Sequence, residues 1–312
     1  MIDFRYHLIS IVAVLLALSI GIVMGTGVFG GPLLEDLKDR VEEVRAQNAN
    51  LRNDINDLQG RVSDQQRFAE DVAPYLLPGS LEGVDVVVLE FEGVAGGLVD
   101  EVRDEVEQAG GDVASTITIT TKFGLEDQTD RDELALDLRS SSSDAEDLML
   151  ETAQALGTRA AVVAAPGTPS TTARSRLETL IQELADNGFL SVSRKSDDVT
   201  VPAGASFLVL GGGEALPGYR ADEFAAELSA ALARGRSGVL AAETTNSKWA
   251  MTSAILDNSA ARDSVATVGG ADKVEGRIAV ILGLERAING FPGHYGSGDG
   301  ADSVLPAPSP SS

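Results

Sequence analysis

The feature that most constrains the fold is an uncharged stretch near the N-terminus. From Leu8 to Leu34 the sequence contains no Asp, Glu, Lys or Arg. A helix needs about 20 apolar residues to cross a bilayer, and a helix that is apolar on every face has to lie in lipid or deep in a large core. We therefore interpret residues 1–29 as a membrane anchor, with the span at residues 8–28.

A cleaved secretory signal is the alternative interpretation. Its apolar region is about 7 to 15 residues long and precedes a small-x-small cleavage site, whereas this run is longer and ends in Met24-Gly-Thr-Gly-Val-Phe. Arg5 precedes the span, and Glu35 and Asp36 follow it. The positive-inside rule then favours a cytoplasmic N-terminus. We expect a single-pass protein of the cell membrane with the bulk of the chain outside the cytoplasm.

Residues 30–76 carry a heptad pattern that is typical of a coiled coil. The a positions are Leu34, Val41, Asn48, Ile55, Val62 and Ala69, and the d positions are Leu37, Val44, Leu51, Leu58, Gln65 and Val72. β-Branched residues at a, leucine at d and one Asn at a favour a parallel two-stranded coil in a fixed register.

The flanks of this predicted coil are basic, although the whole chain has a net charge of −24. In a parallel homodimer Arg40 at g would face Arg45 at e, which costs stability. We infer a partner helix with acidic flanks. A homodimer remains the alternative, because an exposed like-charge pair costs only about a few tenths of a kcal/mol. The predicted partner-binding residues are Arg40, Val41, Val44, Arg45, Asn48, Leu51, Arg52, Ile55, Leu58, Arg61 and Val62.

Residues 80–289 predict an α/β globular domain. Short apolar β-rich runs alternate there with amphipathic helical stretches, which is typical of a doubly wound, mostly parallel sheet. Residues 73–80 contain two prolines and predict a hinge, and the Gly-, Ser- and Pro-rich residues 290–312 predict a disordered tail. The predicted strands are 84–91, 112–123, 160–165, 207–210 and 238–242, and the predicted helices are 98–109, 144–156, 173–187, 221–234 and 273–289.

Few residues of this domain suggest chemistry. The chain has no cysteine and only two histidines, His7 and His294, so it offers neither a thiolate site nor an ordered histidine for a catalytic triad. The loop Gly93-Val-Ala-Gly-Gly97 lacks the order of a dinucleotide fingerprint and is more typical of a tight turn. We expect no enzymatic activity and no cofactor, and the acidic charge disfavours a nucleic-acid partner.

Acidic residues at the carboxyl ends of the predicted strands are candidate ligands for a hard cation. Glu90, Glu92 and Glu243 occupy such positions. Solvated carboxylates are the expected background in so acidic a chain, and we therefore predict no metal site there.

The opening Met1-Ile-Asp-Phe-Arg-Tyr-His-Leu-Ile-Ser-Ile-Val, followed by the coiled coil, the α/β domain and Gly293-His-Tyr-Gly, resembles the MctB family of copper-transport-associated proteins. That family also contains SteB-like proteins of daughter-cell separation. The resemblance implies a membrane-anchored extracytoplasmic protein. It implies either copper efflux as an envelope channel, or a septal complex with a SteA-like protein that engages a peptidoglycan hydrolase through coiled coils.

The residues themselves favour a scaffold over a copper channel. Copper(I) prefers clustered Met and Cys ligands and copper(II) prefers imidazole, but the chain has no cysteine and its methionines are scattered at Met1, Met24, Met149 and Met251. A channel needs several spanning helices or a barrel. We predict a membrane-tethered adaptor in envelope assembly or daughter-cell separation, with a copper-transport component in copper homeostasis as the alternative.

Overall fold

The computed structural model describes residues 4–27, 30–94, 97–195, 199–214, 219–235, 237–298 and 300–307. The chain divides into two units, Met1–Gln65 and Gln66–Ser312. The first unit contains helix α1 (Phe4–Gly27) and most of helix α2 (Gly30–Leu76). The second contains the end of α2 and an α/β fold.

Helix α1 confirms that residues 8–27 of the uncharged stretch are helical. Its residues Phe4–Gly25 have a mean hydropathy of 2.7, none of them is buried, and they are long and apolar enough to cross a membrane. Of the predicted anchor, residues 1–3, 28 and 29 lie outside the described residues.

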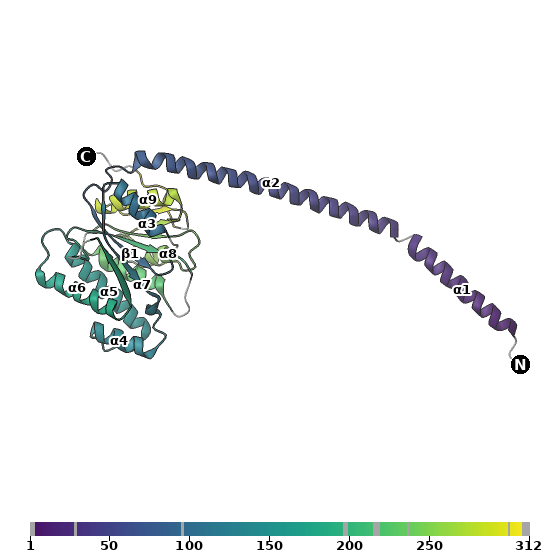
Figure 1. Cartoon of the computed structure of the whole chain (residues 1–312), viewed down its shortest axis with the longest axis horizontal. Helices are drawn as coiled ribbons and strands as arrows, with labels where there is room; N and C mark the ends of the chain where they lie inside the picture. Colours follow the sequence, from purple (N-terminus) through teal and green to yellow (C-terminus); the bar gives the residue numbers. More distant parts are fainter. Residues whose placement is uncertain are drawn as a thin grey trace. The chain divides into compact units, whose positions relative to one another are not determined.

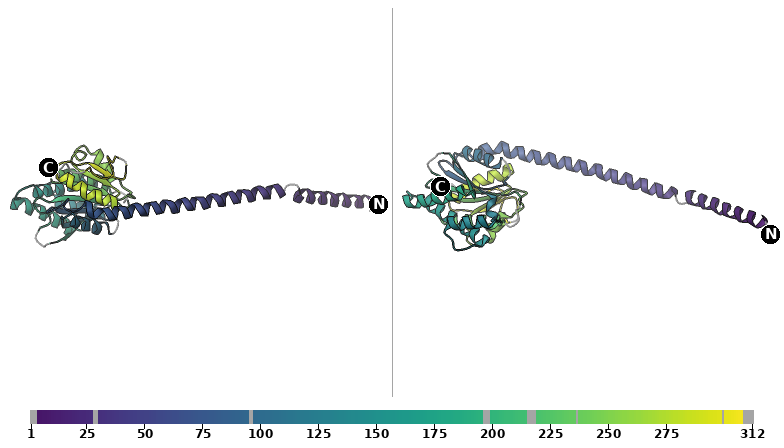
Figure 2. Two further views of the ribbon diagram at one scale, coloured as in Figure 1. Left: turned by 90° about the horizontal axis from the view of Figure 1, so that it is seen from above. Right: turned by 60° about the horizontal axis from the view of Figure 1, so that its bottom comes forward.

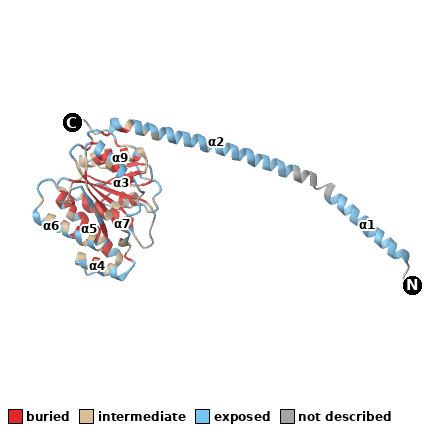
Figure 3. Ribbon diagram, viewed as in Figure 1, coloured by how far each residue is buried: buried red, intermediate tan, exposed pale blue. Residues whose placement is uncertain are grey.

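Leu, Glu, Arg, Gln and Ala, which all have high helix propensity, supply just over half of residues 34–73 and favour helix α2, although Asp and Asn are also frequent there. Ion pairs at a spacing of four residues add to this. Its described side chains are exposed as far as Gln65 (Figure 3).

The second unit is built on one sheet. Within the described residues it has seven strands in the order β3-β2-β1-β4-β5-β6-β7, and every neighbouring pair is parallel except β2 and β3. This is the predicted doubly wound, mostly parallel sheet. The strands are β1 (Asp85–Phe91), β2 (Asp112–Ile119), β3 (Leu190–Arg194), β4 (Ser206–Gly211), β5 (Val239–Glu243), β6 (Ala266–Gly269) and β7 (His294–Gly296).

Helices cover both faces of the sheet (Figures 1 and 2). The helices of this unit are α3 (Leu98–Gln108), α4 (Gln128–Leu138), α5 (Ala145–Ala164), α6 (Thr171–Asp186), α7 (Ala221–Ala233), α8 (Met251–Asp257) and α9 (Val274–Ile288). Alternate residues of β1 point to opposite faces. Val86 and Val88 join the core with α3 and α9, whereas Val87 and Leu89 join the core with α4 to α8.

Two predicted strands differ from the structure, because the prediction assigned apolar runs to strands from the spacing of their apolar residues alone. Residues 160–165 do not form a strand, since α5 continues to Ala164, and a short run that is apolar throughout suits a buried helix as well as a strand. The predicted strand 112–123 ends at Ile119, and a 3-10 helix (Thr121–Gly124) follows. The pattern also missed α4, α8, β3 and β6.

The predicted hinge at residues 73–80 is packed. Helix α2 passes through Pro74 and ends at Leu76. Ala73, Leu77 and Leu81 are buried in the core formed with α3 and α9. The last turns of α2 therefore belong to the α/β unit, which begins at Gln66.

The prediction of a disordered tail from residue 290 was wrong for β7. This strand pairs with β6, and Tyr295 is only 7% exposed. Glycine makes the pairing possible, because a Cβ on Gly296 would collide with the carbonyl oxygen of Gly269. Composition alone reads such glycines as disorder, and residues 308–312 lie outside the described part of the chain.

Candidate functional site

An extended row of exposed apolar side chains lies on α2. We call it the apolar stripe: Leu37, Val41, Val44, Leu51, Ile55, Leu58 and Val62, each 42–59% exposed. All seven residues stand at predicted a and d positions. Burying a fully exposed side chain of this kind contributes about 1.5–3 kcal/mol, and these half-exposed side chains would contribute only part of that to a complex. Among these positions Asn48 breaks the stripe, and its side-chain amide donates to the Val44 carbonyl at 2.9 Å. The side chain of Leu34 lies outside the described residues.

The basic flank of α2 is partly neutralised within the chain. Arg40 Nε donates to Asp36 Oδ2 at 3.0 Å, and Lys38 Nζ lies 4.0 Å from Glu42 Oε1. Both pairs are exposed, so each contributes little to stability. The first pair nevertheless places the anion of Asp36 beside Arg40, which lowers the cost of bringing a second arginine near it.

The carboxyl edge of the sheet is where α/β folds of this type bind ligands, at the point where the strand order reverses. Here that point lies between β1 and β4. The loops after these strands touch each other, because a Cβ on Gly213 would collide with the Gly93 carbonyl oxygen. Lys248 N–H donates to the Gly213 carbonyl at 2.9 Å, which adds the loop after β5 to this contact. Gly96 of the predicted turn lies outside the described residues.

Trp249 packs inward at this edge. Its ring meets Phe91 edge to face, with 5.1 Å between centroids. A Cβ on Gly211 would lie 2.7 Å from the indole, so glycine is required beneath it. Asp272, which the sequence-based prediction missed, accepts hydrogen bonds from the N–H and hydroxyl of Thr245 at 2.6 and 2.7 Å.

The structure does not bring the three candidate cation ligands together. Glu90 accepts from the Thr118 hydroxyl at 2.6 Å, and Glu92 accepts from the Thr121 N–H at 2.7 Å. Glu243 accepts from the N–H and hydroxyl of Thr252 in the first turn of α8. Glu90 links the neighbouring strands β1 and β2, whereas Glu92 and Glu243 each bind the start of a helix. The described residues contain no group of three His, Asp or Glu side chains that could hold a metal ion.

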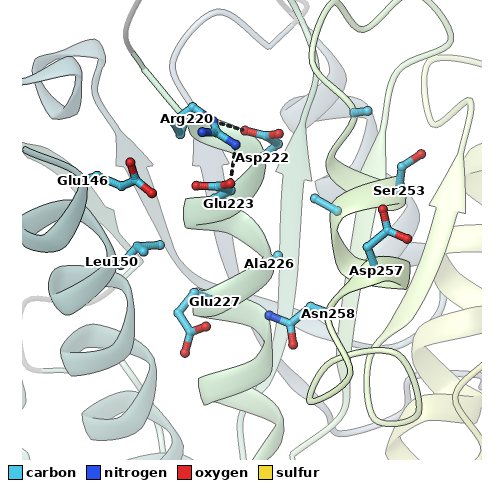
Figure 4. Close-up of a pocket in the computed structure, with 12 residues that line it drawn as sticks. Glu146, Leu150, Arg220, Asp222, Glu223, Ala226, Glu227, Ser253, Asp257 and Asn258 are labelled. Atoms are coloured by element: carbon cyan, nitrogen blue, oxygen red, sulfur yellow. Dashed lines mark hydrogen bonds and ion pairs between the residues drawn. The ribbon is translucent and has the colours of Figure 1, made fainter.

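An acidic groove of about 580 Å³ lies on the surface between α5, α7 and α8. Figure 4 shows Glu146 from α5 and Glu223 from α7 at the same opening, with Asp257 of α8 beyond them. Arg220 forms ion pairs with Glu223 and, at 3.8 Å, with Asp222. The sequence-based prediction missed the groove because three helices contribute to it.

The soft-ligand residues of the described chain do not gather either. Met149 and Met251 are buried on different helices, and Met24 lies in α1. His294 Nδ1 is 2.9 Å from the Thr267 hydroxyl. Met1 lies outside the described residues. These side chains offer no preorganised copper site.

Comparison with known proteins assigns the chain to a family. Residues 1–306 match the family model described as "Copper transport outer membrane protein, MctB". The chain belongs to the MctB family. It is 30% identical over 323 residues to Copper transporter MctB of Mycobacterium tuberculosis (strain ATCC 25618 / H37Rv), covering 97% of this chain and 99% of that protein. The protein of the same name from Mycobacterium leprae (strain TN) is also 30% identical, over 322 residues.

The family match confirms the resemblance deduced from the sequence, and it covers both units of the structure. The names of the family and of these relatives fit the copper-homeostasis alternative better than the adaptor prediction. A membrane-associated copper-transport family also fits α1, which is long and apolar enough to cross a membrane.

Proposed function

We propose that this chain is a membrane-anchored envelope protein that contributes to copper homeostasis, and that it does so by assembling through α2 rather than by coordinating copper. Membership of the MctB family supports the copper role. The exposed apolar stripe of α2 supports the assembly role, because seven large apolar side chains in water favour a partner surface. We further propose that α1 is retained with its N-terminus in the cytoplasm.

An indirect copper role suits the side chains of this protein. Tight copper sites need several sulfur or imidazole ligands held in place by surrounding groups. Met149 and Met251 are instead core residues, and the imidazole of His294 is engaged with Thr267. We therefore propose that the α/β unit is a non-catalytic module.

Adaptor function in daughter-cell separation is the second candidate. The same stripe supports it, and the partner would be a helix with acidic flanks that match Arg45, Arg52 and Arg61. The two candidates differ in their cellular readout, since only the first requires that loss of the chain changes copper tolerance.

The test of the proposal combines growth with binding. Cells that lack the native copy should grow poorly at raised copper, and expression of this chain should restore growth. Calorimetry on the full chain in detergent micelles should show only weak, non-stoichiometric copper binding. Unchanged copper tolerance after deletion would contradict the homeostasis role, and one tight site would contradict the indirect mechanism.

A further inference from the structure

The apolar surface of α2 divides into two after Val62. One set of residues turns toward the chain's own α/β unit: Gln66, Ala69, Ala73 and Leu77 follow at helical spacing and become progressively buried. Ala73 is 8% exposed and Leu77 is fully buried, both against the core of α3 and α9. This set is already covered.

The other set stays exposed and carries two aromatic rings. Phe68 is 70% exposed and Tyr75 is 86% exposed, and Leu76 beside them is 42% exposed. We call these three residues the aromatic patch. Phe68 and Tyr75 are seven residues apart and both stand at g positions, so they continue the edge of the apolar stripe. Exposed aromatic side chains in such a position are typical anchors of protein interfaces.

The heptad register shows what would lie against the patch. In a parallel two-stranded coil each g residue faces the e residue of the next heptad on the other helix. Phe68 therefore faces Ala73 of the second helix. In a second copy of this chain Ala73 is covered by that copy's α/β unit, so Phe68 meets that unit. The contact is reciprocal, because each unit would cover the patch of the other copy.

Several observations fit a parallel pair of identical chains. β-Branched residues at a, leucine at d and Asn48 at a favour a parallel dimer in fixed register. Anchors in one membrane also hold two copies parallel. The one repulsive flank pair, Arg40 with Arg45, is softened by Asp36, which bonds to Arg40 at 3.0 Å.

We propose that two copies of this chain pair in parallel through the apolar stripe, and that the α/β unit of each copy covers the aromatic patch of the other. The inference rests on the proposed assembly through α2 and specifies its partner. The aromatic patch is thus part of the dimer interface and not a docking site for another protein.

The first test measures self-association of the full chain in detergent micelles by sedimentation. We expect a dimer. Replacing Phe68 and Tyr75 together by Ala should weaken it at least about tenfold, whereas Phe291→Ala, at another exposed ring, should not. Circular dichroism checks that the variants stay folded. A monomer at all concentrations, or equal dimer strength in the patch variant, would overturn the proposal.

A charge substitution separates the two kinds of partner. Arg45→Glu would place Glu opposite Arg40 of the second copy, so the dimer should become several-fold tighter. The same change would repel a helix with acidic flanks. Weaker self-association of Arg45→Glu would overturn the proposal.

Introduced cysteines report the register, because the chain has none of its own. Ile55→Cys at a should form an intermolecular disulfide in the membrane, and Asn53→Cys on the outer face should not. Absence of the Ile55→Cys cross-link would overturn the parallel pairing. The proposed function is tested by a different result: unchanged copper tolerance after disruption of the apolar stripe would contradict it and leave the dimer unaffected as a proposal.

Discussion

Asp272 ties the loop after β6 to the loop after β5 through Thr245. Burial alone would raise the pKa of this carboxyl group, but the hydrogen bonds from Thr245 and the ammonium of Lys273 outweigh it and lower the pKa below its ordinary value of 3.8. A carboxylate with a lowered pKa stabilises the fold above its unfolded pKa and loses that contribution as the pH falls through the folded value.

We therefore expect Asp272→Asn to change the pH dependence of stability. Near pH 7 the free energy of unfolding of the variant should be about 1 kcal/mol lower than that of the unsubstituted protein, because a charged hydrogen-bond acceptor is lost. Below the folded pKa the two proteins should converge. Urea unfolding of the full chain at pH 7 and at successively lower pH values follows this difference, and a deficit that does not shrink as the pH falls would contradict the assigned role.

At Tyr219 we expect a substitution to preserve or raise stability, in contrast to the loss expected at Asp272. Its hydroxyl is buried without a hydrogen-bond partner among the described residues, and burial raises the pKa of this group. Removing an unpaired buried hydroxyl is neutral or stabilising, by about 0–1 kcal/mol. Tyr219→Phe should therefore raise or preserve the unfolding midpoint in urea. A loss greater than about 1 kcal/mol would show that the hydroxyl has a partner.

At this scale the sequence indicated residue types better than residue roles. It placed Glu90, Glu92 and Glu243 at the carboxyl ends of strands, and the structure confirms those positions. The local sequence does not show which donors these carboxylates bind. Strand pairing brings the Thr118 hydroxyl to Glu90, and the turn into α8 brings the Thr252 hydroxyl to Glu243. No local pattern signals a bond such as that between Asp272 and Thr245, because 27 residues separate them.

Among the elements, long periodic segments were predictable and short apolar ones were not. The heptad spacing of apolar residues predicted α2, and continuous apolar runs predicted β1 and β4. The run at residues 160–164 was misassigned because this part of α5 packs against α7 and is buried there except at Val162. The packing partner, and not the local sequence, decides between helix and strand for such a run.

Helix α5 packs closely against α7 at Gly157. A Cβ there would lie 2.6 Å from the Cβ of Ala231 and 2.8 Å from the Leu228 carbonyl oxygen. Helix propensity favours Gly157→Ala by about 1 kcal/mol, whereas the collision should cost more. We expect a net loss of about 1–2 kcal/mol in urea unfolding, with the exposed Gln154→Ala as the control. A stabilised Gly157→Ala variant would contradict the close packing.

For the whole molecule, the uncharged stretch and the acidic residues after it predict a retained span with the remaining chain outside the cytoplasm. A reporter that is active only outside the cytoplasm should be active when fused after Ser312. The mature protein should also keep its N-terminal residues. A mature N-terminus near Thr26 would instead identify α1 as a cleaved signal.

We propose that the protein acts on copper tolerance through the apolar stripe of α2. Leu51→Asp with Leu58→Asp buries charge in the stripe, whereas Ala46→Asp with Asn53→Asp adds the same charge on the outer face at the same spacing. The most direct measurement is the growth of deletion cells at raised copper when they express each double variant at equal level. We predict that the stripe variant fails like an empty vector and that the outer-face variant restores growth. Full growth with the stripe variant would show that the protein does not act on copper tolerance through the apolar stripe.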